Sequence, residues 1–254
     1  MDIGEPPPLK RPMTSPFLLI ADHASNHVPD DIDLRIDPAL LNTHIALDIG
    51  VAELGALLCE GLNCPGIFAG VSRLVIDFNR EEDEPGLIPI SSDGYVIPGN
   101  DGNHNARIER FYRPYHDKIA AQIVAQHPRL IISLHSFTPR LKTSDVERPW
   151  EVGVLYNADN RAAQIVIPML TAAGVCVGDN LPYSGKVLNA TMNRHAESKG
   201  IAYLGLEVRQ DLISHPDGAA QWADVLARVI EACLHALESA TLPRHSISQK
   251  VSTL

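Results

Sequence analysis

The stretch Phe17–Asn26 reads FLLIADHASN, and it joins a run of strand-forming apolar residues directly to an acid and a histidine. Two later stretches repeat this design. LIISLHS at Leu130–Ser136 carries His135 near its end, and YLGLEVRQD at Tyr203–Asp211 carries Glu207. Short apolar runs bounded by polar residues are typical of buried strands. Ligands of parallel sheets bind beyond the carboxyl ends of the strands. The polar residues of the three stretches are therefore predicted to converge on one crevice.

Strand-like and helix-like segments alternate along the chain. Expected strands cover 17–21, 73–78, 130–134, 152–156, 175–178 and 203–208. Expected helices cover 38–60, 106–126, 161–173 and 218–239, with a break or kink of the second near Pro114. This alternation predicts an α/β fold with a mostly parallel central sheet. We expect a single domain over 17–241, a flexible lead-in over 1–16 and a loose polar tail over 242–254.

The segment 81–105 has no periodicity and is rich in Gly, Pro, Asp and Asn. A loop of this length in a compact domain is usually functional. Because it directly follows Arg80, it is predicted to form a rim or lid of the site.

Composition limits the classes of function. The chain has 254 residues, 45% of them hydrophobic, and a formal net charge of −10. Such an acidic balance argues against a broad nucleic-acid footprint. No apolar run reaches membrane-spanning length, and the Pro-rich start lacks the apolar core of a secretory signal. The four cysteines, which form no CxxC pair, indicate reduced thiols. We expect a cytoplasmic protein with no membrane or nucleic-acid partner, and composition leaves the oligomeric state open.

His23 and His135 are candidate metal ligands, because imidazoles on rigid strand ends suit zinc. A single histidine is more often an ordinary surface or core residue, so the indication comes from the pair. The third ligand is open. Asp48 lies in an apolar helical pattern, where a carboxylate needs a partner. Asn26 stands three residues after His23, where a His-x-x-Glu motif would have its acid, and Asp22 is expected to point away.

Glu207 is a candidate general base, since a carboxyl group in an apolar strand has a raised pKa unless it is paired. The alternative is a salt bridge to Arg209 on the same strand face. Arg80, which closes IDFNR, could hold a carboxylate or stabilise an oxyanion. Its alternative is an ion pair with Asp77 or with the acidic run 81–84.

Two further motifs carry candidate site residues. Arg194 and His195 follow the PYSG loop and could clamp an anionic group, or they could be solvated helix residues. Arg110 and His116 of FYRPYH could also reach the site. Serines flank both strand-end histidines, which leaves a metal-free Ser-His hydrolase open, although no GxSxG motif is present.

Six short blocks, in this order and spacing, resemble the signature of the N-formylglutamate amidohydrolase family, the N-formylglutamate deformylases and their relatives. The blocks are DHASNHVP, ALDIG, LVIDFNR, RPYH, SLHS and LEVRQDLI, and they cover about residues 17–215. The family is similar in fold to the zinc carboxypeptidases and the aspartoacylase group. The resemblance therefore implies a three-layer α/β/α domain whose mixed central sheet is mostly parallel.

The resemblance implies metal-dependent hydrolysis of the amide bond of an N-acyl amino acid such as N-formylglutamate, a reaction of amino-acid metabolism. One divalent metal, zinc by preference, would activate water. His23 and His135 match the metal histidines. The chain does not keep a His-x-x-Glu, so Asp48 in the ALDIG block is the first choice for the third ligand and Asn26 the second.

By the same resemblance, Glu207 matches the general base and Arg80 a catalytic and substrate-binding residue. The substrate would be a small molecule with a carboxylate. Its expected contacts are Asn79, Arg80, Arg194, His195 and Arg209. The alternative reading is a non-catalytic or divergent relative that binds an anionic metabolite.

Overall fold

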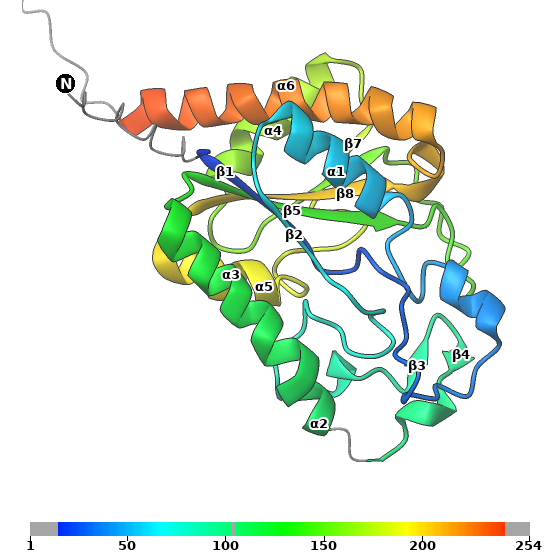
Figure 1. Cartoon of the computed structure of the whole chain (residues 1–254). Helices are drawn as coiled ribbons and strands as arrows, with labels where there is room; N and C mark the ends of the chain where they lie inside the picture. The colour runs from blue at the N-terminus through cyan, green and yellow to red at the C-terminus, as the bar shows by residue number, and fades with distance from the viewer. Residues whose placement is uncertain (1–14, 103–104, 242–254) are drawn as a thin grey trace, which may run out of the picture.

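The computed structural model describes residues 15–102 and 105–241 (Figure 1). Most of the expected lead-in and the whole expected tail lie outside this range. A six-stranded sheet has the order β2-β1-β5-β8-β6-β7. Its strands are β1 (Phe17–Ala21), β2 (Gly66–Phe68), β5 (Leu130–Phe137), β6 (Val152–Leu155), β7 (Val177–Asp179) and β8 (Ala202–Arg209). The first four in this order are parallel. β6 pairs with β8 antiparallel and with β7 in parallel, so the mostly parallel mixed sheet is confirmed.

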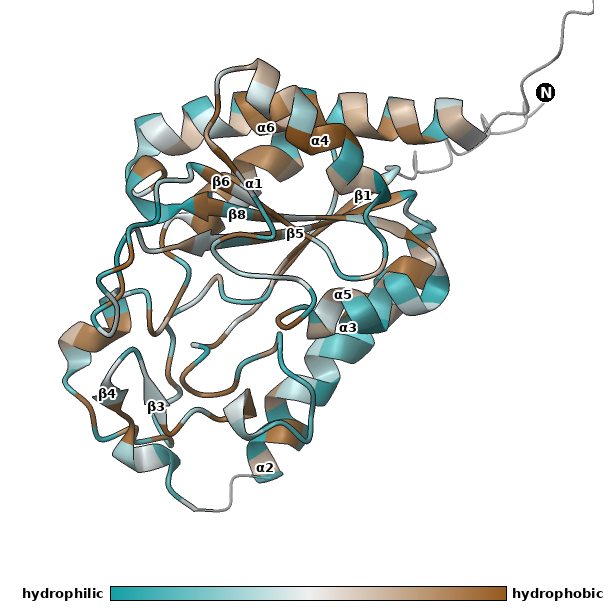
Figure 2. Cartoon of the chain, turned by 180° about the vertical axis from the view of Figure 1, so that it is seen from behind, coloured by the Kyte–Doolittle hydropathy of each residue, from teal (hydrophilic) through white to brown (hydrophobic). Residues whose placement is uncertain are grey.

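Helices cover both faces of the sheet and complete the three layers (Figure 1). One face carries α1 (Val51–Gly61), α4 (Arg161–Ala172) and α6 (Pro216–Thr241), and the other carries α3 (Arg113–Gln126) and α5 (Ala190–His195). The strands are brown, the colour of hydrophobic residues, in Figure 2, as expected for a sheet buried between two helical layers. None of the described helices is long and apolar enough to cross a membrane.

Each face of the sheet packs against helices in its own hydrophobic core, and successive side chains of β5 and β8 point alternately into one core and the other. Leu134 and Leu206 pack in the core formed with α1, α4 and α6. Ile131 and Tyr203 pack in the core formed with α3. Because successive side chains point to opposite faces, His135 and Glu207 point to the same face as Ile131 and Tyr203. These two are directly paired across the parallel ladder.

The expected helix over 38–60 is wrong in its first half. A short 3₁₀ turn covers Pro38–Asn42, and α1 begins only at Val51. Gly50 explains the break. Its φ is +81°, and a Cβ at this position would lie 2.2 Å from the carbonyl oxygen of Ile213. The chain between the two helical pieces is therefore irregular, and it carries Asp48.

The expected strand over 73–78 is also wrong, although its apolar side chains are buried as predicted. The backbone turns here instead of extending, since the N–H of Val75 donates to the carbonyl of Ser72. Side chains satisfy the buried carbonyls: Asn100 donates to Leu74, and Arg107 donates to Val75. Sequence reasoning missed the three-residue strand β2, which takes the edge position beside β1.

The remaining segments include the irregular region that follows Arg80. It contains 3₁₀ turns at Pro85–Leu87 and Pro98–Asn100 and a small hairpin of β3 (Ser91–Ser92) and β4 (Tyr95–Val96). The expected helix over 106–126 consists of α2 (Asn105–Arg107), a π-helical segment (Ile108–Tyr112) and α3. Further 3₁₀ turns lie at Glu197–Lys199 and Gln210–Leu212.

Candidate metal and catalytic site

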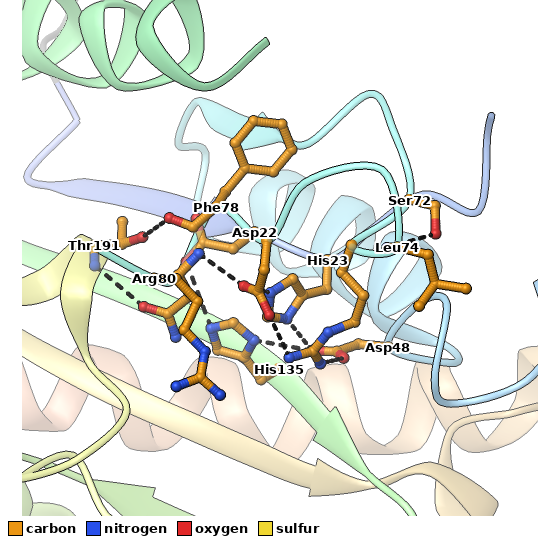
Figure 3. A network of polar contacts seen from close by, with 12 residues as sticks. Asp22, His23, Asp48, Ser72, Leu74, Phe78, Arg80, His135 and Thr191 are labelled. Carbon is orange, nitrogen blue, oxygen red and sulfur yellow. Dashed lines mark hydrogen bonds and ion pairs between the residues drawn. The ribbon is translucent and has the colours of Figure 1, made fainter. Parts of the chain in front are cut away.

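His23, Asp48 and His135 meet near the carboxyl ends of β1 and β5 (Figure 3). Oδ2 of Asp48 lies 3.3 Å from Nδ1 of His23 and 2.9 Å from Nδ1 of His135. One possible ligand atom from each residue lies within 4.8 Å of the others, and all three side chains are buried. The structure thus brings together the first-choice set of metal ligands. Asn26 is elsewhere, donating to Asn42.

Backbone contacts fix Asp48 in this cluster. Its N–H donates to the carbonyl of His23 at 2.9 Å. Its Oδ2 also accepts from the N–H of Ser136 at 3.3 Å, directly after His135 in β5. The irregular chain that precedes Gly50 is what allows this approach, because a continuous helix would hold these backbone groups in its own ladder.

A second carboxylate lies behind each histidine. Nε2 of His23 is 2.7 Å from Oδ1 of Asp77. Nε2 of His135 faces Oδ2 of Asp22 at 3.7 Å, and both atoms are buried without a hydrogen-bond partner among the described residues. Asp22 is in turn held by the hydroxyl of Tyr115, which donates to its Oδ1 at 2.7 Å. Metal-binding histidines usually have such carboxylates behind them, which orient the ring. The donor set therefore fits a divalent cation bound through the Nδ1 atoms.

Arg73, which sequence reasoning did not select, bridges Asp48 and Asp77. Its guanidinium lies 3.3 Å from Oδ1 of Asp48 and 2.7 Å from Oδ2 of Asp77. Burial and Arg73 lower the pKa of His23, but Asp77 and Asp48 outweigh them and raise it to about 9. Burial would raise the pKa values of both carboxyl groups, but His23 and His135 hold that of Asp48 well below the usual range. Arg73 and His23 do the same for the pKa of Asp77. Without a metal, the positive charges of Arg73 and His23 therefore balance the carboxylates of Asp48 and Asp77, and a bound cation would replace the proton on His23.

Glu207 stands beside His135 on the neighbouring strand β8. It is 7% exposed, and its Oε2 has no partner among the described residues. Burial raises its pKa to about 7, although the nearby His135 opposes the shift. The alternative of a salt bridge to Arg209 is wrong. Arg209 pairs with Asp211 at 2.8 Å, since it lies past the buried part of the strand.

Arg80 and Asn79 are held by contacts from two helices. The hydroxyl of Thr191 donates to the carbonyl of Phe78 at 3.2 Å, and its N–H donates to Oδ1 of Asn79 at 3.1 Å (Figure 3). The hydroxyl of Tyr112 donates to the carbonyl of Arg80 at 2.7 Å. Among the described residues, the guanidinium of Arg80 pairs with Glu84 at 3.4 Å, which is the alternative expected with the acidic run 81–84, and it makes no ion pair with Asp77.

A pocket of about 260 Å³ joins these groups. It is lined by the histidine cluster, Glu207, Arg73, Asp77, Asn79 and Arg80. Ser92 and Asp93 of the β3–β4 hairpin also line it, which places part of the expected rim at the site. His44 and Asp93 were not selected from the sequence: His44 lies within the expected helix over 38–60, and Asp93 lies in the irregular segment 81–105. Asp77 had a signal in the IDFNR block, but only as a partner for Arg80.

Five other candidates lie outside the pocket lining: Arg110, His116, Arg194, His195 and Arg209. Arg194 pairs with Glu81 at 3.1 Å and stacks over Tyr112, and Arg209 is held by Asp211. His195 is buried against His116, with Nε2 2.9 Å from Nδ1. Nε2 of His116 contacts the carbonyl of Phe78, so this pair supports the segment that carries Arg80.

Arg110 forms an ion pair with Asp31 away from the pocket. Ser25 and Ser136 donate to the backbone carbonyls of Gly70 and Ile49. Among the described residues, no serine side chain is hydrogen-bonded to His23 or His135. This geometry disfavours the Ser-His hydrolase.

A buried His-Asp-His cluster at the carboxyl ends of central strands of an α/β sheet, with a Glu beside it whose Oε2 is unpaired among the described residues, defines a class of hydrolase site that suits metal-assisted chemistry. A model of the N-formylglutamate amidohydrolase family matches residues 15–214. The chain belongs to the N-formylglutamate amidohydrolase family, a family of hydrolases, as the six blocks predicted.

Two solved structures are similar over most of the chain. The gene product Atu2144 from Agrobacterium tumefaciens is 30% identical with a TM-score of 0.84, over 88% of this chain and 92% of that one. N-formylglutamate amidohydrolase from Ralstonia eutropha JMP134 is 19% identical with a TM-score of 0.68, over 89% and 95% of the two chains. The second likeness bears on the fold alone. A search of curated proteins finds no match.

Proposed function

We propose that the chain is a metal-dependent amidohydrolase that cleaves the amide bond of an N-acyl amino acid, with N-formylglutamate as the leading candidate. One observation carries the proposal: the buried His23–Asp48–His135 cluster shares a pocket with the carboxyl of Glu207, whose Oε2 has no partner among the described residues. Family membership supports the choice of reaction.

His23, Asp48 and His135 would hold one divalent cation, zinc by preference. Two imidazoles and a carboxylate are a common ligand set for catalytic zinc. Asp77 and Asp22 would orient the two rings from behind. When bound, such a cation acts as a Lewis acid toward a carbonyl oxygen and lowers the pKa of water towards 7.

Glu207 is the proposed general base. Its raised pKa of about 7 matches the requirement that a general base be poised near the working pH. In the proposed reaction Glu207 accepts a proton from the attacking water and returns it to the nitrogen of the leaving amine. Burial keeps competing solvent away from this proton transfer.

Arg80 is the proposed partner of the substrate carboxylate, with Asn79 beside it. Both line the pocket, and within the described part of the chain the one ion pair that Arg80 would give up is the 3.4 Å contact with Glu84. A guanidinium matches a carboxylate in a two-pronged geometry. Arg73 is less available for this role because Asp48 and Asp77 already engage it.

The competing reading, a relative that only binds an anionic metabolite, drew its support from the missing His-x-x-Glu. Asp48 offers a carboxylate in place of that motif's acid, so the missing motif no longer supports a non-catalytic protein. We also propose a cytoplasmic location, in keeping with four free cysteines.

A screen of N-formyl and N-acetyl amino acids tests the function. The metal-free protein would be assayed for release of the amino acid, with and without added zinc. The proposal requires turnover of at least one compound with a free carboxylate that depends on metal. Absence of turnover across the panel at full metal loading would refute it.

A further inference from the structure

His44 lines the pocket but belongs neither to the metal cluster nor to the segment of Arg80. It follows the 3₁₀ turn Pro38–Asn42 in the irregular stretch that precedes α1. Its side chain is 25% exposed, whereas those of His23 and His135 are 3% and 6% exposed. It is therefore the pocket histidine that a bound molecule could most readily reach.

Asp93 fixes the position of His44. Nε2 of His44 lies 2.9 Å from Oδ2 of Asp93, whose side chain is only 5% exposed. Asp93 also accepts from the N–H of Lys142, the N–H of Thr143 and the hydroxyl of Thr143, at 2.8, 2.9 and 2.7 Å. Burial alone would raise the pKa of Asp93, but these donors lower it to about 2. The anchor of His44 is thus an ionised, fully bonded carboxylate.

The backbone around Asp93 gives this anchor a defined place. Asp93 and Gly94 have φ values of 42° and 77° in the turn between β3 and β4. An Asp-Gly pair with two positive φ values is the preferred tight hairpin turn. The hairpin, the loop that begins after β5 and the stretch before α1 therefore meet at one carboxylate.

Nδ1 of His44 can still bind a ligand. Nε2 is committed to Asp93, and no group within 15–102 and 105–241 pairs with Nδ1. Because Nε2 points at the carboxylate of Asp93, a carboxylate at Nδ1 is bound by the ring form that carries N–H donors on both nitrogens.

The charges of the pocket suggest what this nitrogen binds. Two arginines line the pocket: Arg73 is engaged by two carboxylates, and Arg80 is available for one. The other three arginine candidates, Arg110, Arg194 and Arg209, have acidic partners outside the pocket lining. A substrate with two carboxylates needs a second hydrogen-bonding partner beside Arg80, and His44 lines the pocket with a ring nitrogen that is unpaired among the described residues.

Building on the function proposed above, we propose that His44 is a specificity-determining residue that binds the acidic side chain of the N-acyl amino acid, while Arg80 binds the α-carboxylate. The pocket then selects dicarboxylic over aliphatic substrates. Asp93 acts through His44 as a positioning residue.

The substitution His44→Gln tests binding of the substrate side chain separately from the structural contact with Asp93. The amide nitrogen of glutamine can occupy the place of Nε2 and keep the hydrogen bond to Asp93, while the Nδ1 donor is lost. His235→Gln, at an exposed position of α6, is the matched control. Zinc-loaded wild type and both variants would be titrated calorimetrically with glutamate and with norvaline, whose side chain has similar length and no charge. The kcat/KM values for the two N-formyl derivatives would be measured in parallel.

We expect the wild type and the control to prefer glutamate, and His44→Gln to reduce that preference about 10- to 100-fold, the usual effect of a hydrogen bond to a charged group. Norvaline binding and the melting temperature should not change. An unchanged preference in the variant, an equal loss for both ligands, or a wild type without preference would overturn the role of His44. If no N-formyl compound turns over but glutamate binding still depends on His44, the inference stands and the proposed reaction fails.

Discussion

Replacing Glu207 by glutamine removes the basicity of the proposed general base while it keeps the shape of the side chain. The side chain is buried, makes no salt bridge with Arg209 and leaves Oε2 unpaired. Few structural contacts are therefore lost. We expect kcat to fall about 10²–10⁴-fold, the usual contribution of a positioned acid or base. Zinc content and the affinity for substrate should change little.

The same substitution has a predicted effect on stability. Burial raises the pKa of Glu207 from 4.5 to about 7, so the folded metal-free protein binds this proton more tightly than the unfolded chain. Such a group stabilises the fold below pH about 4.5, and this contribution is lost as the pH rises to about 7. A shift of this size corresponds to at most about 3 kcal/mol. The wild type should therefore lose stability relative to the glutamine variant across this range.

The assay combines three measurements on one preparation: zinc content, denaturant unfolding of the metal-free protein at pH 5 and pH 8, and turnover of the zinc-loaded protein. A kcat equal to that of the wild type in a folded, zinc-replete variant would remove Glu207 from the mechanism. A large loss of zinc, with activity restored by excess metal, would instead make Glu207 a ligand. For the zinc-loaded wild type, kcat/KM should fall toward low pH, because protonated Glu207 cannot accept a proton.

Three other predictions concern the metal and the carboxylate site. His135→Ala should abolish zinc retention as measured by elemental analysis, and full occupancy in this variant would exclude His135 as a ligand. Because the pKa of His23 is about 9 and its proton must leave before a cation binds, zinc affinity should rise about tenfold per pH unit between pH 6 and 9. Competition with a chromophoric chelator measures this slope, and a flat profile would contradict binding through His23. Arg80→Lys should raise KM about tenfold for free-acid substrates but not for their amides, since the two-pronged contact is lost. Equal effects on acid and amide would argue against carboxylate binding at Arg80.

Much of the fold could be predicted because its signals are local. The apolar runs that contain His135 and Glu207 are fully buried strands, and their C-terminal ends lie in register. Alternation along a strand then puts both side chains on one face. For these residues, strand period and strand end sufficed to predict a shared crevice.

The position of Asp48 could not be predicted in this way. The sequence favours one long helix, and the break depends on the approach of Gly50 to the carbonyl of Ile213, more than a hundred residues away along the chain. The prediction of a strand over residues 73–78 was wrong for a related reason. Their apolar pattern indicates burial correctly, but Asn100 and Arg107 satisfy the backbone that a strand would pair.

The partner of a long cationic side chain can be set by a tertiary contact. Arg194 pairs with Glu81, more than a hundred residues away along the chain, and its local sequence gives no sign of this pairing. Likewise, Arg73 meets Asp48 only because two irregular segments pack together. The partner of Arg209 is Asp211, two residues along, so this pairing could have been read from the sequence.

Stoichiometric reactivation tests the central claim most directly. The chelated protein would be titrated with zinc while the release of glutamate from N-formylglutamate is followed. A cation held by His23, Asp48 and His135 predicts that activity is absent at the start, rises linearly with zinc and reaches its plateau at about one ion per chain. Full activity in the chelated protein, or no activity at any zinc loading, would contradict the account.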